Sequence, residues 1–185
     1  MPIDKCKRNA LYLIYMKNFT KGFTLIELLI VIALLGALAV GLLAALDPFE
    51  QLKKGTDTGV RNTVSEVHGA IIRFYAIKNY MPWCTDGDTC TDPSAATLTD
   101  LEATVIDSII ATGELKSDFS ELAGTGTLGK ILVTGVNADA TVSVCYAPTA
   151  KSFASDPNTK FTSAGLPDAN CPSGDPLDSC YWCVK

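Results

Sequence analysis

The chain has 185 residues, of which 48% are apolar, and a formal net charge of −5 at neutral pH, a length that predicts one domain with an appendage. Its charge is uneven, because residues 84–185 contain fourteen Asp and Glu against five Lys, a net of −9. Such a surface repels phosphate backbones, so we expect no direct binding of nucleic acid. One histidine and no clear nucleophile–base pair give little support for an enzyme, and we expect no catalytic residues.

The first predicted element is an apolar helix. Residues 28–46 contain no charged or strongly polar side chain. As a helix they would cover about 28 Å, close to the hydrocarbon thickness of a bilayer. The preceding segment is basic, with Lys5, Lys7, Arg8, Lys17 and Lys21 against the single acid Asp4. Because cytoplasmic loops are enriched in Lys and Arg, we expect this end to stay inside and the rest to be exported.

Two ordinary explanations of this segment are incomplete. A secretory signal peptide would have a shorter apolar stretch and a cleavage site such as Ala37-Leu38-Ala39, but here the apolar sequence continues past that site. A plain signal anchor fits the length and the charge, yet it leaves Glu27 and Lys21-Gly22-Phe23 unexplained. An acid deep in a bilayer costs about 3 kcal/mol, so Glu27 must find a partner or reach the headgroups.

The stretch KGFTLIE, residues 21–27, with its basic leader and the apolar run that follows, resembles the prepilin signal of type IV pilins and type II secretion pseudopilins. The resemblance implies that a membrane peptidase cuts between Gly22 and Phe23 and methylates the new amine of Phe23. It also implies that Glu27 pairs with the Phe23 amine of a neighbouring subunit; its own Phe23 amine and the headgroups are alternatives. Because such leaders are often short, Met16 is a second candidate start.

The resemblance further implies partners and a location. The partners would be copies of the chain and other pilins in a filament, the prepilin peptidase, and an inner-membrane assembly platform with its ATPase. The chain would cross the inner membrane once, with its N-terminus inside and its head outside, before joining an extracellular pilus or a periplasmic pseudopilus. The alternative from another class is a monomeric, membrane-anchored extracytoplasmic binding module, with or without calcium, which needs neither cleavage nor Glu27.

The helical pattern continues beyond the apolar run. Spacings of four, three, four and three residues separate the apolar side chains Val60, Val64, Val67, Ile71 and Phe74. This is one stripe of an amphipathic helix, which we expect to end at Met81-Pro82. His68, beside the stripe, is read as structural. Between the two halves the helix is weakened by Gly36, Gly41, Pro48, Gly55 and Gly59. Asp47-Pro48 is the expected kink, in a segment that either merely tolerates these residues or bends or melts when subunits pack.

The head is predicted to contain a short helix and a hairpin. Thr99 and Glu102 fit a capping box that would open a helix through Glu114, with Leu101, Val105, Ile109 and Ile110 inward. Residues 130–136 and 140–146 read as strands joined at residues 137–139, and residues 151–154 as part of a weaker third strand.

Six of the seven cysteines follow the apolar run: Cys84, Cys90, Cys145, Cys171, Cys180 and Cys183. An even number in an exported segment favours disulfides over zinc, for which no paired CxxC motif exists. Six cysteines allow fifteen pairings; we favour Cys84–Cys90, Cys171–Cys180 and Cys145–Cys183. Cys180 and Cys183 also have the spacing of a redox CxxC, but such motifs usually sit at a helix start in a βαβ unit.

Oxygen-bearing side chains crowd the tail, and Asp168, Asn170, Asp175 and Asp178 are candidate calcium ligands against the simpler reading of a solvated acidic loop. Asp86, Asp88 and Asp92 form a second, weaker candidate. Beyond calcium we expect no cofactor. The chain is therefore divided into a leader (1–22), a transmembrane polymerisation helix (23–46), its amphipathic continuation (47–82) and a head (83–185) with a cysteine-rich tail from about 163. The predicted fold class is α+β and pilin-like: a long helix on a small antiparallel sheet, with a disulfide-stapled tail.

Overall fold

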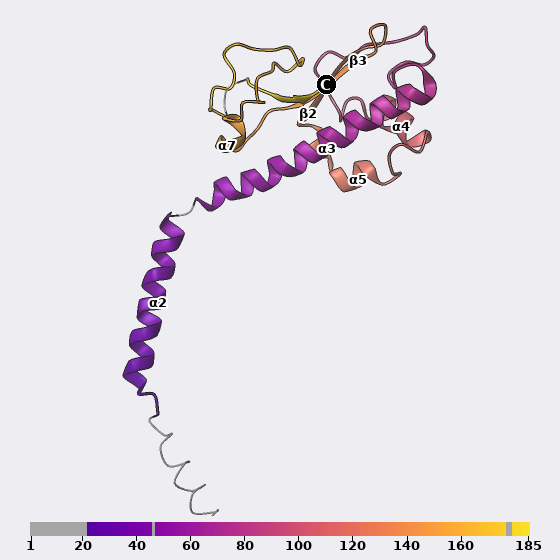
Figure 1. Cartoon of the computed structure of the whole chain (residues 1–185). Coiled ribbons are helices and arrows are strands. Elements are labelled where there is room, and N and C mark those ends of the chain that lie inside the picture. The colour runs from indigo at the N-terminus through magenta and orange to yellow at the C-terminus, as the bar shows by residue number, and fades with distance from the viewer. Residues whose placement is uncertain (1–21, 46, 177–178) are drawn as a thin grey trace, which may run out of the picture. The chain divides into compact units, whose positions relative to one another are not determined.

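The computed structural model describes residues 22–45, 47–176 and 179–185 (Figure 1). The chain divides into two compact units, Met1–Asp47 and Pro48–Lys185. The leader up to Lys21, the apolar residue Leu46 and the candidate calcium ligand Asp178 lie outside the described residues.

Helix α2, Leu25–Ala45, is the apolar helix of the first unit. It is the one helix in the described residues that is long and apolar enough to cross a membrane. Gly36 and Gly41 do not interrupt it. None of its side chains is buried, so its stability within the chain comes from its backbone hydrogen bonds and its high content of good helix formers.

Helix α3, Pro48–Lys78, opens the second unit and runs without a break through Gly55 and Gly59. Proline favours the first helical position, because its fixed φ suits the helix and its missing N–H would be unpaired there. The helical run is therefore interrupted at the predicted Asp47-Pro48 position. All five residues of the predicted apolar stripe are buried, which confirms the amphipathic helix. Its end comes at Lys78, before Met81-Pro82, because Asn79 adopts a left-handed conformation with φ of 61°.

The sheet of the head has four antiparallel strands in the order β1-β2-β3-β4. They are β1 (Ala96–Thr97), β2 (Ile131–Val136), β3 (Thr141–Tyr146) and β4 (Trp182–Val184). The hairpin of β2 and β3 is confirmed, with Val133 opposite Val144. The predicted strand at residues 151–154 is wrong, because Lys151–Ala154 forms the short helix α7. The edge strands come instead from two short distant segments that pair with β2 and β3.

The segment after β1 is helical, as expected, but it begins differently. A π-helical turn, η2 (Glu102–Ile106), leads into α4 (Asp107–Ala111), so the helix ends before Glu114. The capping box at Thr99 is wrong, because Leu101 occupies the N-cap position without a side-chain bond. In the turn before η2, Thr97 Oγ1 accepts from the Asp100 N–H and donates to the Asp100 carboxylate.

One face of the sheet packs on α3, while η2, α4 and two further short helices, α5 (Phe119–Ala123) and α6 (Thr125–Leu128), complete the cover (Figure 1). Val105, Ile106 and Ile109 are buried, whereas Leu101 and Ile110 are only partly buried. Val142, Val144 and Tyr146 of β3 belong to this core. The result is an α+β, pilin-like arrangement of a helix on a small antiparallel sheet, with disulfides that include the C-terminal segment.

Candidate processing and assembly site

The predicted cleavage site lies immediately before α2. Gly22, Phe23 and Thr24 precede the first helical residue, and Phe23 is 80% exposed. The peptide bond between Gly22 and Phe23 is thus exposed and outside the helix, as proteolysis sites commonly are.

Thr24 and Glu27 form a capping box at the start of α2. The Glu27 carboxylate (Oε2) accepts hydrogen bonds from the Thr24 backbone N–H at 2.8 Å and from its hydroxyl at 2.7 Å. In return, the Glu27 N–H donates to Thr24 Oγ1 at 3.3 Å. These bonds satisfy N–H groups at a helix start, which have no partner within the helix.

This capping box was not among the predicted features, although its signal is present in the sequence. Thr24 and Glu27 have the spacing of the motif and precede an apolar run. The structure thus gives Glu27 a local partner in Thr24, while its pairing with the Phe23 amine of a neighbouring subunit stays a prediction. Both bonds to Thr24 use the same oxygen, and a carboxylate has about four acceptor sites, so a further donor can still bind.

The surface of α2 is apolar on all sides. Thirteen of its large apolar side chains, from Leu25 to Leu43, are 46–81% exposed in the chain by itself. A helix that is apolar all round must be covered by lipid or by other helices, because exposure of that area to water is unfavourable at about 25 cal/mol per Å².

In the head, carboxylates on α3 hold the start of α7. Asp57 is 2% exposed, and its Oδ2 accepts from the backbone N–H groups of Thr149 at 2.8 Å and Ala150 at 2.7 Å. Its Oδ1 accepts from the Thr149 hydroxyl at 2.8 Å, and Glu50 accepts from the Lys151 N–H at 2.6 Å. These contacts explain why residues 151–154 begin a helix rather than a strand.

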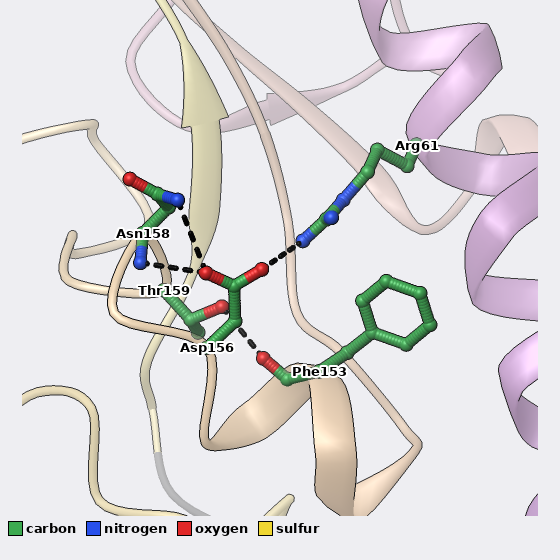
Figure 2. Close-up of polar contacts among 5 residues, drawn as sticks. All are labelled: Arg61, Phe153, Asp156, Asn158 and Thr159. Atoms are coloured by element: carbon green, nitrogen blue, oxygen red, sulfur yellow. Dashed lines mark hydrogen bonds and ion pairs between the residues drawn. The ribbon is translucent and has the colours of Figure 1, made fainter.

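One turn along α3 from Asp57, Arg61 makes a second connection to the same segment (Figure 2). Its guanidinium lies 3.1 Å from Asp156, and its central carbon lies over the rings of Phe153 and Trp182, 4.5 Å from each centroid. The Asn158 backbone N–H, helped by Arg61, holds the pKa of Asp156 below its usual value. The Thr159 hydroxyl donates to the Phe153 carbonyl, which joins the two ends of the segment 153–159.

Three disulfides join Cys84 to Cys90, Cys145 to Cys183 and Cys171 to Cys180, the pairs favoured by the sequence. Cys145 and Cys183 are also register partners across β3 and β4. Cys180 and Cys183, spaced like a redox pair, are each bonded to a different cysteine, so they form no CxxC disulfide.

The candidate calcium ligands are used locally. Asp168 accepts from the N–H and the side-chain amide of Asn170, and Asp92 accepts from the Trp83 indole and the Asn137 N–H. Thr89 and Asp88 N–H groups hold the pKa of Asp86 below its usual value. Within the described part of the chain, no group of three or more His, Cys, Asp or Glu is arranged to hold a metal ion. Calcium binding at the tail, where Asp175 belongs to the same candidate set, stays a prediction.

His68 is half-buried and lines a hollow of about 340 Å³ with Ile72, Val142 and Lys185. Burial lowers its pKa, which favours the neutral imidazole. Thr141 and Ser143 also line this hollow, and no Asp or Glu side chain is among its described lining residues. The structural reading of His68 stays an interpretation.

These features define an α+β protein with a capped apolar helix, a disulfide-bonded head and an exposed segment at the predicted cleavage position. Residues 17–43 match the family model of the prokaryotic N-terminal methylation motif, the prepilin-type signal of type IV pilins and pseudopilins. Comparison of the chain with curated proteins and with solved structures gave no match. The chain thus carries the signal of a pilin-like precursor, and that signal is typical of structural subunits.

Proposed function

We propose that the chain is a structural subunit of a type IV pilus or pseudopilus. After cleavage between Gly22 and Phe23 and methylation of Phe23, the subunits assemble through α2. The observation that carries this proposal is the combination of the matched signal with a helix whose apolar side chains are exposed on every side. In the membrane lipid covers this surface, and in a filament the helices of other subunits replace the lipid.

The orientation follows from charge. The basic leader stays in the cytoplasm, and the acidic, disulfide-bonded head lies outside, where an oxidising compartment allows its three disulfides to form. The chain would interact with prepilin peptidase, like subunits, and an assembly platform with its ATPase, and would itself catalyse no reaction.

Mass spectrometry of sheared surface filaments and, separately, of membranes tests the proposal. A chain that begins with N-methyl-Phe23 in the sheared fraction would support a surface pilin. The same chain in membranes alone would support a pseudopilin or a minor subunit. An uncut chain would refute filament assembly and favour the monomeric tethered module.

The capping box allows the roles of Glu27 to be separated. Glu27→Gln keeps a side chain that can cap the helix but removes its charge, whereas Thr24→Ala removes the cap's hydroxyl and keeps the charge. If Glu27 pairs with the Phe23 amine of another subunit, Glu27→Gln should abolish filaments while Thr24→Ala retains them. Retention of filaments in Glu27→Gln with their loss in Thr24→Ala would mean instead that helix capping is the requirement.

A further inference from the structure

The first two and a half turns of α3, residues 48–56, lie at the edge of the head, which they contact through the bond between Glu50 and the Lys151 N–H. Their side chains are exposed or half-buried, and the first buried residue of α3 is Asp57. Phe49 lies eleven residues before Val60, about three helical turns, and so on the same side of the helix. Val60 is 3% exposed but Phe49 is 74% exposed. The apolar face of α3 therefore continues past the residues that the head buries.

Leu52 extends this exposed apolar surface. It follows Phe49 at the i+3 spacing that places side chains beside each other on a helix, and it is 69% exposed. Two large apolar side chains on adjacent turns, with polar residues on the remaining faces, are typical of a helix segment that lies in the headgroup layer of a membrane.

The position of these turns along the chain indicates which surface they meet. Helix α2 has 21 residues, and its length of about 31 Å matches a hydrocarbon core of about 30 Å. Phe49 follows Ala45 by four residues, so their Cα atoms can be no more than about 14 Å apart. When α2 spans a bilayer, Phe49 is thus held within reach of the headgroup layer.

The charges at these turns also suit a lipid surface. Lys53 is exposed and Lys54 half-buried directly after Leu52, and their long side chains can place ammonium groups at lipid phosphates. The nearby carboxylate of Glu50 is bonded to the Lys151 N–H, and that of Asp57 is buried. The three acids and three lysines at this position give no net charge: Asp47, Glu50, Asp57, Lys53, Lys54 and Lys151. Residues 84–185, in contrast, have a net charge of −9.

We propose that Phe49 and Leu52 insert into the headgroup layer of the membrane that α2 crosses, with Lys53 and Lys54 bound to lipid phosphates. This contact holds the start of α3 at the bilayer until the subunit leaves it. The inference rests on the proposed function only in requiring that α2 spans a membrane, and it applies equally to a tethered monomer.

Photocrosslinking of the full chain tests this contact. The chain is reconstituted into vesicles of phosphatidylethanolamine and phosphatidylglycerol, with benzoyl-phenylalanine at position 49 or 52. Matched controls carry it at Ile77 or Leu122, which are 58% and 72% exposed in the head. Ile77 lies about 42 Å from Phe49 along the same helix. A mass consistent with three intact disulfides confirms that each variant is folded.

Several-fold more lipid adduct at positions 49 and 52 than at 77 and 122 is the expected result. Equal yields at all four positions, or none at 49 and 52, would overturn the proposal. Adducts at 49 and 52 to a second copy of the chain would also overturn it and assign these turns to a subunit interface. Because the vesicles hold no peptidase or assembly machinery, failure here is distinct from failure of filament formation.

Charge reversal tests the role assigned to the lysines. The double variant Lys53→Glu, Lys54→Glu should lower the lipid adduct at position 49 in vesicles that contain phosphatidylglycerol. In vesicles of phosphatidylethanolamine alone it should change the yield much less, because the anionic surface potential is absent. An unchanged yield in both kinds of vesicle would exclude lysine–phosphate contacts.

Discussion

The carboxylate of Asp57 accepts a 2.7 Å hydrogen bond from the backbone nitrogen of Ala150, 93 residues further along the chain. Asp57→Ala should lower the free energy of unfolding by about 2–4 kcal/mol, because it leaves buried N–H groups without an acceptor. Asp57→Asn should cost less, since its amide oxygen can still accept. Denaturant unfolding of the full chain in detergent, followed by tryptophan fluorescence, measures both changes.

Glu121, an exposed carboxylate on α5, provides the matched control. Glu121→Gln should change the unfolding free energy by less than about 0.5 kcal/mol. If Asp57→Ala had no larger effect than this control, the contact with Ala150 would not stabilise the head.

Arg61 should not be replaceable by lysine. Its planar guanidinium lies over two rings while it pairs with Asp156, and an ammonium group cannot stack in that way. Arg61→Lys should lower the free energy of unfolding by about 1–2 kcal/mol and change the near-UV circular dichroism of Trp182. The variant Trp182→Leu should remove most of this difference between Arg and Lys. A lysine variant as stable as the parent chain would contradict the stacking argument.

His68 should make the head less stable in mild acid. Burial lowers its pKa in the folded state, so the unfolded chain binds the proton more tightly. The free energy of unfolding should therefore fall as the pH drops below about 6.5, the ordinary histidine value. Lys185 is the charged side chain that lines the same hollow. His68→Gln should show a smaller fall between about pH 7 and pH 5; identical pH profiles would rule out the effect.

Gly135 is required by the close approach of Trp83. A Cβ at this position would overlap the indole ring, which is itself held by its bond to Asp92. Gly135→Ala should cost about 1–3 kcal/mol through overpacking. At Gly126, on α6, a Cβ would meet no atom within 4 Å, so Gly126→Ala should be neutral or slightly stabilising. Thermal unfolding of the two variants in parallel distinguishes the packing effect at Gly135 from the effect that replacing any glycine with alanine has on stability.

The contribution of each disulfide to the free energy of unfolding should increase with the length of the loop that it closes. Cys145 and Cys183 are 38 residues apart, and Cys84 and Cys90 are six apart. The chain-entropy relation gives about 4 kcal/mol for the longer loop and about 2 kcal/mol for the shorter one. Replacement of each pair by serine, followed by denaturant unfolding, should show this order. The reverse order would mean that packing around the bonds outweighs chain entropy.

Several features could be predicted because their signals are local. The apolar length of residues 28–46 predicted α2, and the spacing of Val60, Val64 and Val67 predicted the buried face of α3. Alternation in residues 140–146 predicted β3. The capping box of Thr24 and Glu27 had an equally local signal, although it was not among the predicted features.

Other features had no local signal. Strands β1 and β4 contain two and three residues, too few for a recognisable alternation, and they form because β2 and β3 offer unpaired edges. The partners of Asp57 and Arg61 also lie about ninety residues away.

The sequence by itself therefore determined the processing signal, the apolar helix, the amphipathic helix and the central hairpin, because periodicity and length act through neighbouring residues. Only the tertiary structure decided the edge strands, the helical state of residues 151–154 and the exposure of Phe49. These depend on which distant backbone groups satisfy one another's hydrogen bonds, and on how far the head reaches along α3.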